Sequence, residues 1–227
     1  MIITSKKKCK IPIIFVHIPK TAGTSIKEYI GKNNLNDLVH MKLSEMKNYF
    51  YDKEKRYNKI KFRDYFKFTV LRNPWERMVS IYEYRKETSK KSYWENIRKK
   101  NYNFNEFLKY FLDLFGLEEL ISRGSYLKYI TLNKKIKVDY AINFHNFEKD
   151  FKVIKKIKIG QKNLIQKLLK SNKKDYRKYY NSESLDLINY IHKDDIEIFK
   201  FDFENTSFMD LSSIKNKCEA SKKFFKT

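Results

Sequence analysis

The distribution of apolar residues along the chain indicates strands that alternate with helices. Two segments, Ile13–Ile18 and Tyr65–Leu71, are almost continuously apolar and rich in β-branched or aromatic residues. Such runs are typical of strands that are buried on both faces. Weaker strand patterns occupy Tyr129–Leu132 and Ile136–Phe144, on either side of a polar turn.

Apolar residues recur at helical spacing between and after these segments. The helix after the second strand has the clearest start, because Asn73 suits the N-cap, Pro74 the first helical position and Glu76 the third. We expect this helix to end near Glu87. The other segments expected to be helical are Thr24–Ile30, Ser44–Tyr51, Asn103–Phe115, Phe147–Ile157 and Ser182–Phe199.

Alternation of strands and helices is typical of an α/β fold. The expected architecture is a three-layer, P-loop-like sandwich whose central, mainly parallel sheet is flanked by helices. The 227 residues show neither an internal repeat nor a clear linker, so we expect a single domain over residues 1–227. Within it, residues 1–10 form a basic N-terminal segment, and residues 212–227 are expected to form a flexible tail.

The charge of the chain predicts attraction to anions. Lys and Arg number 50 and Asp and Glu 27, which gives a formal net charge of +23. An excess of this size favours phosphate esters, nucleic acid, acidic polysaccharide or an anionic membrane as partners. Compositional drift is the alternative, since Lys, Asn and Ile are abundant throughout. Charge alone therefore does not identify the ligand.

The chain carries no sign of a membrane span or a metal site. It contains no run of about 18 apolar residues, which a transmembrane helix would need. Its two cysteines, Cys9 and Cys218, lie near opposite ends and have neither metal-ligand spacing nor a disulfide framework. We therefore expect a cytoplasmic protein that binds no metal.

The first candidate motif joins the first strand to the first helix and contains Pro19 and Gly23, from two scarce residue types. Ligands bind at such turns in parallel sheets. Helix N-terminal amides and the hydroxyls of Thr24 and Ser25 can bond anionic oxygens, and Lys20 adds a positive charge. The motif is not a Walker A loop, because no glycine precedes the lysine. An ordinary polar turn is the alternative.

The second candidate motif again joins a strand to a helix. Arg72 follows the strand directly, and Ser80 lies about two helical turns later. The planar fork of an arginine, together with a hydroxyl, suits a terminal phosphate monoester. Two anion sites at the ends of two strands imply a ligand that is phosphorylated at two separated positions.

The motifs HIPKTAGTS and FTVLRNPWERMVS resemble those of the carbohydrate sulfotransferases, in particular the branch with heparan sulfate 2-O-sulfotransferase and chondroitin sulfotransferases. The resemblance implies 3′-phosphoadenosine 5′-phosphosulfate (PAPS) as sulfuryl donor and 3′,5′-ADP as product. It also implies that Arg72 and Ser80 hold the 3′-phosphate. The residues implied to hold the 5′-phosphosulfate are Lys20, Thr21, Ala22, Gly23, Thr24 and Ser25.

The same resemblance implies catalytic roles. Lys20 would stabilise the departing phosphate oxygen, and His40, which falls between the two motifs, would be the base that activates the acceptor hydroxyl. A structural histidine at this position is the alternative, and a carboxylate such as Glu45 or Glu83 would then serve as base. Tyr126 is proposed as a contact for the adenosine.

Other positions carry weaker expectations. His17 and His192 are expected to be structural, the latter as a half-buried side chain on an apolar helix face. The late segments also resemble the family, but this chain has Phe144–Asn146 where many members carry Gly-Arg, so no role is carried over there.

The predicted function is therefore that of a PAPS-dependent sulfotransferase acting on a hydroxyl of a carbohydrate or glycoconjugate. A peripheral contact with the anionic inner face of a membrane is a further hypothesis. A basic nucleic-acid-binding protein is the main alternative, although no helix-turn-helix, zinc-finger or ribonucleoprotein signature is present. An NTP-dependent kinase is disfavoured by the missing Walker A glycines.

Overall fold

The computed structural model describes residues 2–3, 13–30, 40–57, 61–88, 95, 97, 99–156 and 175–205. The chain forms two compact units, each described here by itself. The sheet unit comprises Met1–Leu71, Tyr126–Ser171 and Asp210–Thr227, and the helical unit comprises Arg72–Ser125 and Asn172–Met209. The single domain over 1–227 stays a prediction. Most of the basic segment 1–10 and all of the tail 212–227 lie outside the described residues.

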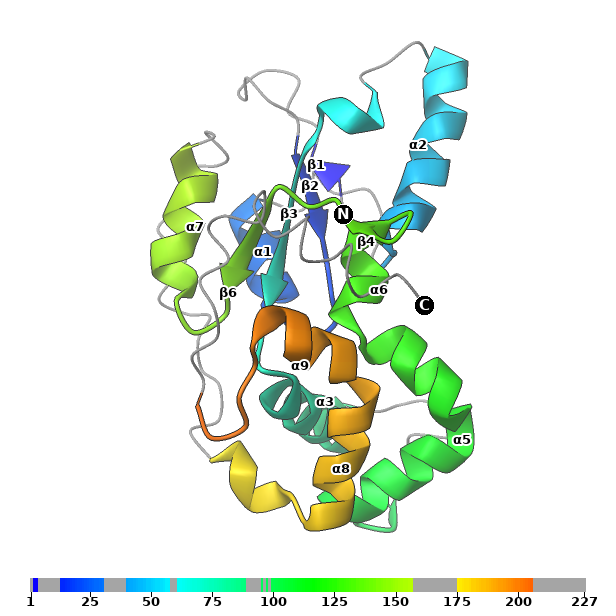
Figure 1. Ribbon diagram of the computed structural model, residues 1–227, viewed down its shortest axis with the longest axis vertical. Helices are drawn as coiled ribbons and strands as arrows, with labels where there is room; N and C mark the ends of the chain where they lie inside the picture. Colours follow the sequence, from blue (N-terminus) through cyan, green and yellow to red (C-terminus); the bar gives the residue numbers. More distant parts are fainter. Residues whose placement is uncertain are drawn as a thin grey trace. The chain divides into compact units, whose positions relative to one another are not determined.

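The sheet unit contains a four-stranded sheet in the order β1-β2-β3-β6 (Figure 1). Its strands are β1 (Ile2–Ile3), β2 (Ile13–Val16), β3 (Phe66–Leu71) and β6 (Tyr140–Asn143). β2, β3 and β6 run parallel to one another, and β1 pairs with β2 in the antiparallel direction. The expected mixed α/β fold with a central, mainly parallel sheet flanked by helices is therefore confirmed.

The register brings the carboxyl ends of the parallel strands to one edge of the sheet. Val16, the last residue of β2, pairs with Thr69, whose hydroxyl donates to the Val16 carbonyl at 2.9 Å. Leu71, the last residue of β3, pairs with Asn143 at the end of β6. The segments that begin at His17 and Phe144 thus leave the sheet at the same edge.

The core of the sheet unit explains why these strands are so apolar. One face of the sheet packs against α1 (Gly23–Ile30) and α7 (Phe147–Lys156). The residues of this core are Ile13, Phe15, Ile26, Phe68, Val70, Ile142, Phe144, Phe147 and Phe151. The alternate residues Ile14 and Val16 are also fully buried, so both faces of β2 are covered.

The remaining elements of the sheet unit correct one sequence expectation. They are α2 (Leu43–Tyr57), η2 (Phe62–Asp64), α6 (Tyr126–Ile130), and a small hairpin of β4 (Thr131–Leu132) and β5 (Lys135–Ile136). The expected strand Tyr129–Leu132 was wrong in its first half, because the buried residues of α6 follow helical spacing.

The expected strand Ile136–Phe144 is also interrupted. Asp139 separates its two halves: its backbone N–H donates to the Lys67 carbonyl at 2.7 Å, and its carboxylate accepts from the Lys67 N–H at 2.8 Å. These two bonds dock the chain onto β3, so that a new pairing begins at Tyr140.

Three helices of the helical unit begin at asparagine caps. Its elements are α3 (Pro74–Thr88), α5 (Phe104–Gly124), η4 (Tyr176–Tyr179), α8 (Ser182–Ile191) and α9 (Lys193–Phe199). Asn73 Oδ1 accepts from the Trp75 and Glu76 N–H groups, which confirms the expected start of α3. α5 is longer than expected because it continues past a break at Gly116, where φ is 72°.

His192 divides the single helix that was expected over Ser182–Phe199. Its backbone is not helical, and its ring, 1% exposed rather than half-buried, contacts the Asp195 carboxylate at 2.9 Å. The other carboxylate oxygen of Asp195 accepts from the Ser125 hydroxyl at 3.1 Å. This buried polar cluster joins the end of α5 to the junction of α8 and α9.

Candidate functional site

The turn after β2 is the first part of the candidate site. His17 and Ile18 follow the strand, and the chain then turns over Pro19 to Ala22 before α1 begins at Gly23. The Thr21 hydroxyl donates to the Ile18 carbonyl at 2.8 Å and closes the turn from within. Thr21 is fully buried, so its hydroxyl stabilises the turn and is not exposed to solvent.

The backbone of this turn has an unusual conformation. Lys20 and Ala22 have φ angles of 64° and 61°, whereas Thr21 between them has a negative φ. Non-glycine residues seldom adopt positive φ, and such strain concentrates at ligand sites. A left-handed residue beside a right-handed one can turn successive N–H groups toward one side, which forms a concave cradle for an anion. The two positive φ angles therefore make this turn a candidate anion site.

The first turn of α1 adds further donors beside it. The first intrahelical bond runs from the Ile26 N–H to the Ala22 carbonyl at 3.1 Å, so the amides before Ile26 have no acceptor within the helix. The helix dipole favours an anion at this end. Thr24 is exposed, whereas Ser25 is buried. Of the two hydroxyls expected to bind the ligand, that of Thr24 is thus the accessible one.

A glycine is required at position 23 because a side chain would not fit, and not because the backbone has a positive φ. Its φ lies outside the left-handed region, but a Cβ on this residue would lie 1.6 Å from His17 Nε2. The missing side chain allows the buried imidazole of His17 to pack against the start of α1. The same ring stacks on Phe15 of β2, with 5.4 Å between the ring centroids.

His40 joins this group from a distant part of the chain. Its ring lies edge-on against His17 at a centroid distance of 4.5 Å, and His40 itself is exposed with a φ of 64°. The sheet unit thus brings together the turn, His17 and His40. His17 was expected to be structural, which its burial does not contradict; the sequence did not predict its contact with His40, although an imidazole at the carboxyl end of a parallel strand, directly before the turn, was visible there.

The carboxylates considered as alternative bases both have structural partners. Glu45 Oε2 accepts from the Lys42 N–H at 2.6 Å, at the start of α2. Glu83 Oε1, in the helical unit, accepts from the Tyr179 hydroxyl at 2.7 Å. Neither geometry favours these groups over His40.

Arg72 and Ser80 form the second part of the candidate site and belong to the helical unit. Arg72 is joined directly to Leu71 at the end of β3, and its Nη2 contacts Glu76 Oε1 at 2.8 Å. The two side chains are 8% and 14% exposed. Ser80 lies farther along α3 and is partly exposed. Arg72 is therefore held by a carboxylate in the first turn of α3, the helix that follows it.

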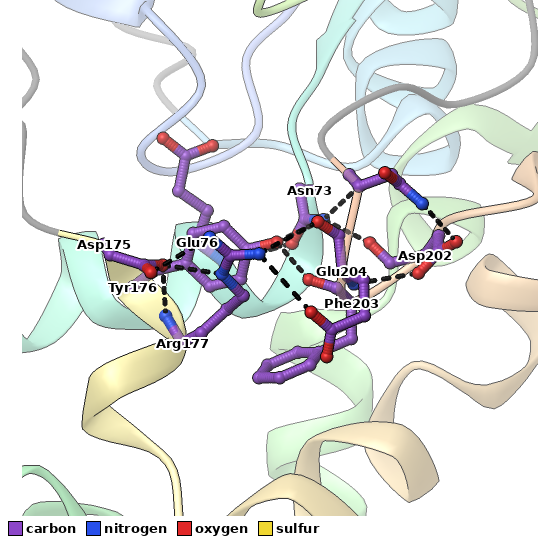
Figure 2. A network of polar contacts seen from close by, with 9 residues as sticks. Asn73, Glu76, Asp175, Tyr176, Arg177, Asp202, Phe203 and Glu204 are labelled. Carbon is purple, nitrogen blue, oxygen red and sulfur yellow. Dashed lines mark hydrogen bonds and ion pairs between the residues drawn. The ribbon is translucent and has the colours of Figure 1, made fainter.

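Asn73 connects this turn to the end of the helical unit. Its Nδ2 donates to the Asp202 carbonyl at 2.9 Å, as Figure 2 shows. It also donates to the Asn205 carbonyl at 3.5 Å. Residues 201–205, which we call the strap, follow α9. The Tyr176 hydroxyl donates to the Phe203 carbonyl in the same strap.

Charged groups complete the network around the strap (Figure 2). Arg177 contacts Asp175 at 2.8 Å and Glu204 of the strap at 3.4 Å. Its hydrogen bonds hold the pKa of the Asp175 carboxyl below its usual value. Burial raises the pKa of Tyr176 to about 12, so its phenol keeps the proton that it donates. The strap is thus held by neutral and charged contacts together.

Tyr126, proposed as an adenosine contact, lies in α6 of the sheet unit and is fully buried. Its proposed role stays a prediction. Within the described ranges, no group of three or more His, Cys, Asp or Glu side chains could hold a metal ion. No helix in those ranges is long and apolar enough to cross a membrane. The segment from residue 157 to 174, which contains six lysines and no acidic residue, lies outside the described residues.

The chain matches the model of a known protein family. The model described as "Sulfotransferase family" matches residues 3–205, a span that contains the turn, His40, Arg72, Ser80 and Tyr126. No curated protein and no solved structure matches the chain.

Proposed function

Because the chain belongs to the sulfotransferase family, we propose that it transfers a sulfuryl group from PAPS to a hydroxyl of a carbohydrate or glycoconjugate. Sulfuryl transfer is the activity of the family as a whole. PAPS as donor, the carbohydrate acceptor and the residue roles belong to this proposal, and the geometry of each part supports it.

The turn after β2 is the observation that carries the proposal. Positive φ angles at Lys20 and Ala22, and the open N-terminus of α1, offer several N–H donors to one anionic group. This geometry supports a site for the 5′-phosphosulfate made by residues 20–25. Lys20 adds a charge that can follow the negative charge on the departing phosphate oxygen.

Arg72 and Ser80 are proposed to hold the 3′-phosphate. An arginine presents several N–H donors in one plane, which suits a phosphate group, and Glu76 Oε1 contacts Arg72 Nη2 at 2.8 Å. β2 and β3 are hydrogen-bonded neighbours, and Arg72 directly follows the last residue of β3. This connectivity supports a single ligand with anionic groups at two separated positions.

His40 is proposed as the base. It would take the proton of the acceptor hydroxyl while the acceptor oxygen forms a bond to sulfur and the bond from sulfur to the 5′-phosphate oxygen breaks. The products are a sulfate ester and 3′,5′-ADP. Exposure of His40 and its contact with His17 support this role, since a base must reach the acceptor and keep a defined orientation.

The acceptor is proposed to be anionic itself or to lie at an anionic membrane surface. The net charge of +23 supports attraction to an acidic glycan or to the inner face of a membrane. The same charge is the basis of the alternative function, nucleic-acid binding, which predicts a steep salt dependence.

Binding of 3′,5′-ADP to the full chain and to Lys20→Ala and Arg72→Ala tests the proposal. We expect micromolar or tighter binding to the wild type and weaker binding to both variants. Failure of the wild type to bind 3′,5′-ADP would refute it. Binding of duplex DNA that is indifferent to Arg72→Ala would favour the nucleic-acid alternative. Incubation of candidate acceptors with PAPS that carries labelled sulfate would then identify the acceptor class.

A further inference from the structure

Asn73 has an unusual position in the helical unit. It is the residue between Arg72 and the first turn of α3, and its side chain is almost completely buried. Both ends of its carboxamide are used. Oδ1 accepts from the Trp75 and Glu76 N–H groups, and Nδ2 donates to carbonyls of the strap.

The strap has its own anchor in the helical unit. The ring of Phe203 lies edge-on against three aromatic rings, those of Trp75, Tyr176 and Tyr180, at centroid distances of 5.5–5.7 Å. Asp202 accepts from the Glu204 N–H at 2.8 Å and from Asn205 Nδ2 at 2.9 Å, which fixes the turn of the strap. These contacts fix the conformation of the strap, so a side chain that is hydrogen-bonded to the strap is held in place.

Asn73 links the strap to Arg72 through contacts with Glu76. The Glu76 N–H donates to Asn73 Oδ1 at 3.2 Å, and the Glu76 carboxylate holds Arg72 at 2.8 Å. Figure 2 shows that the Glu76 side chain points away from the strap, so the strap acts on it through Asn73 and the helix backbone. A change in the orientation of the carboxamide would shift the first turn of α3 and with it the guanidinium.

We propose that Asn73 is a positioning residue for nucleotide binding, tying the strap to the first turn of α3 so that Arg72 is aimed at a 3′-phosphate. This inference rests on the proposed function. It adds a specific consequence: loosening the strap should reduce the contribution of the 3′-phosphate to affinity while leaving that of the rest of the nucleotide unchanged.

The quantity to measure is the ratio of the Kd of adenosine 5′-monophosphate to the Kd of 3′,5′-ADP, by calorimetry on the full chain. Asn73→Ser retains a good N-cap and adds no charge, but its hydroxyl is too short to reach the strap. Tyr176→Phe leaves the Asn73 cap of α3 in place but removes the bond to the Phe203 carbonyl and the 3.4 Å contact between Asn73 Nδ2 and the Tyr176 hydroxyl. We expect each substitution to lower the ratio by about 3- to 10-fold, the effect of losing one or two buried hydrogen bonds.

Tyr82→Phe is the matched control. Tyr82 lies in α3, and its hydroxyl donates to the Tyr102 carbonyl at 2.9 Å. The variant therefore loses one tyrosine hydrogen bond that does not involve the strap. We expect it to keep the wild-type ratio even where its melting temperature falls as far as that of Tyr176→Phe. Hydrogen exchange at the Glu204 amide should accelerate in Asn73→Ser and Tyr176→Phe, but not in the control.

The outcomes separate the two proposals. A wild-type preference for 3′,5′-ADP that survives both Asn73→Ser and Tyr176→Phe, in variants that still melt cooperatively, overturns the inference alone. Faster exchange in the strap with an unchanged ratio overturns it as well, since the tie would then exist without aiming Arg72. A wild-type chain that binds both nucleotides equally refutes the proposed function together with the inference.

Discussion

The ring of His17 lies edge-on against the ring of His40, with 4.5 Å between their centroids. His17 is buried at the carboxyl edge of the sheet, and His40 is exposed. The pair therefore links the turn that is proposed to hold the 5′-phosphosulfate with the group that is proposed to accept a proton. Contact with a buried ring also restricts how the exposed ring can rotate.

Gly23→Ala should disturb this arrangement. The added Cβ would lie 1.6 Å from His17 Nε2, so the ring must move, and overpacking of this kind costs about 1–3 kcal/mol. We expect a lower melting temperature and weaker 3′,5′-ADP binding. His17→Ala in the same chain removes the clash and should restore part of the affinity. Equal affinity of Gly23→Ala and the wild type would contradict the packing described here.

His40→Asn should affect catalysis and not donor binding. Loss of a positioned base typically lowers kcat by about 10²- to 10⁴-fold. Because the proposed donor contacts lie in other residues, the Kd of 3′,5′-ADP should change by less than about threefold, within the scatter of a surface substitution. His145→Asn, which replaces another exposed histidine, is the control and should keep the wild-type kcat. A His40→Asn enzyme with full activity would exclude this histidine as the base.

Arg72 and Ser80 should contribute unequally to binding. A hydrogen bond to a charged phosphate contributes about 1.5–3 kcal/mol; Arg72 can form two such bonds and carries the opposite charge, whereas the Ser80 hydroxyl can donate one. Arg72→Ala is therefore expected to weaken 3′,5′-ADP binding by about 100-fold or more, and Ser80→Ala by about 10-fold. Neither should change the affinity for adenosine 5′-monophosphate, which lacks the 3′-phosphate. An equal loss for both nucleotides would argue against a 3′-phosphate site at these residues.

His192 should make stability depend on pH. Burial lowers the pKa of His192, and the hydrogen bond of the ring to the Asp195 carboxylate offsets this only in part. An unfolded histidine has a pKa of about 6.5, so the unfolded chain takes up more protons than the folded chain as the pH falls below that value. The stabilisation is thus present above about pH 6.5 and is lost at lower pH.

Thermal unfolding between pH 8 and 5 measures this effect. We expect the melting temperature of the wild type to fall more steeply below about pH 6.5 than that of His192→Asn, which has no titrating ring. His145→Asn, at an exposed position, should keep the wild-type slope. Parallel slopes for the wild type and His192→Asn would show that the buried ring does not titrate on unfolding.

Local signals in the sequence were sufficient to predict the strands and the helix that carry the candidate site. Asn73, Pro74 and Glu76 marked the start of α3 because an N-cap depends only on neighbouring residues. The continuous apolar runs marked β2 and β3 because a strand covered on both faces leaves no polar position. The position of both motifs at strand ends followed from these two assignments.

Contacts between distant residues could not be predicted in this way. Asn73 meets Asp202 across 129 positions, and neither residue type indicates the partner of the other. The packing of His17 depends on the missing Cβ of Gly23, a clearance that only the folded turn reveals. His192 fits the apolar stripe of a continuous helix, and the break at this residue arises from its buried bond to Asp195.

Lys20 and Ala22 adopt left-handed backbone conformations without the help of glycine. Each such residue costs roughly 1–2 kcal/mol, and this cost is incurred when the chain folds, before any ligand arrives. A turn that already has the shape of its complex loses little conformational entropy on association. The free protein is in this sense pre-organised, so its selectivity between anions would depend on a backbone conformation that is present before the ligand binds.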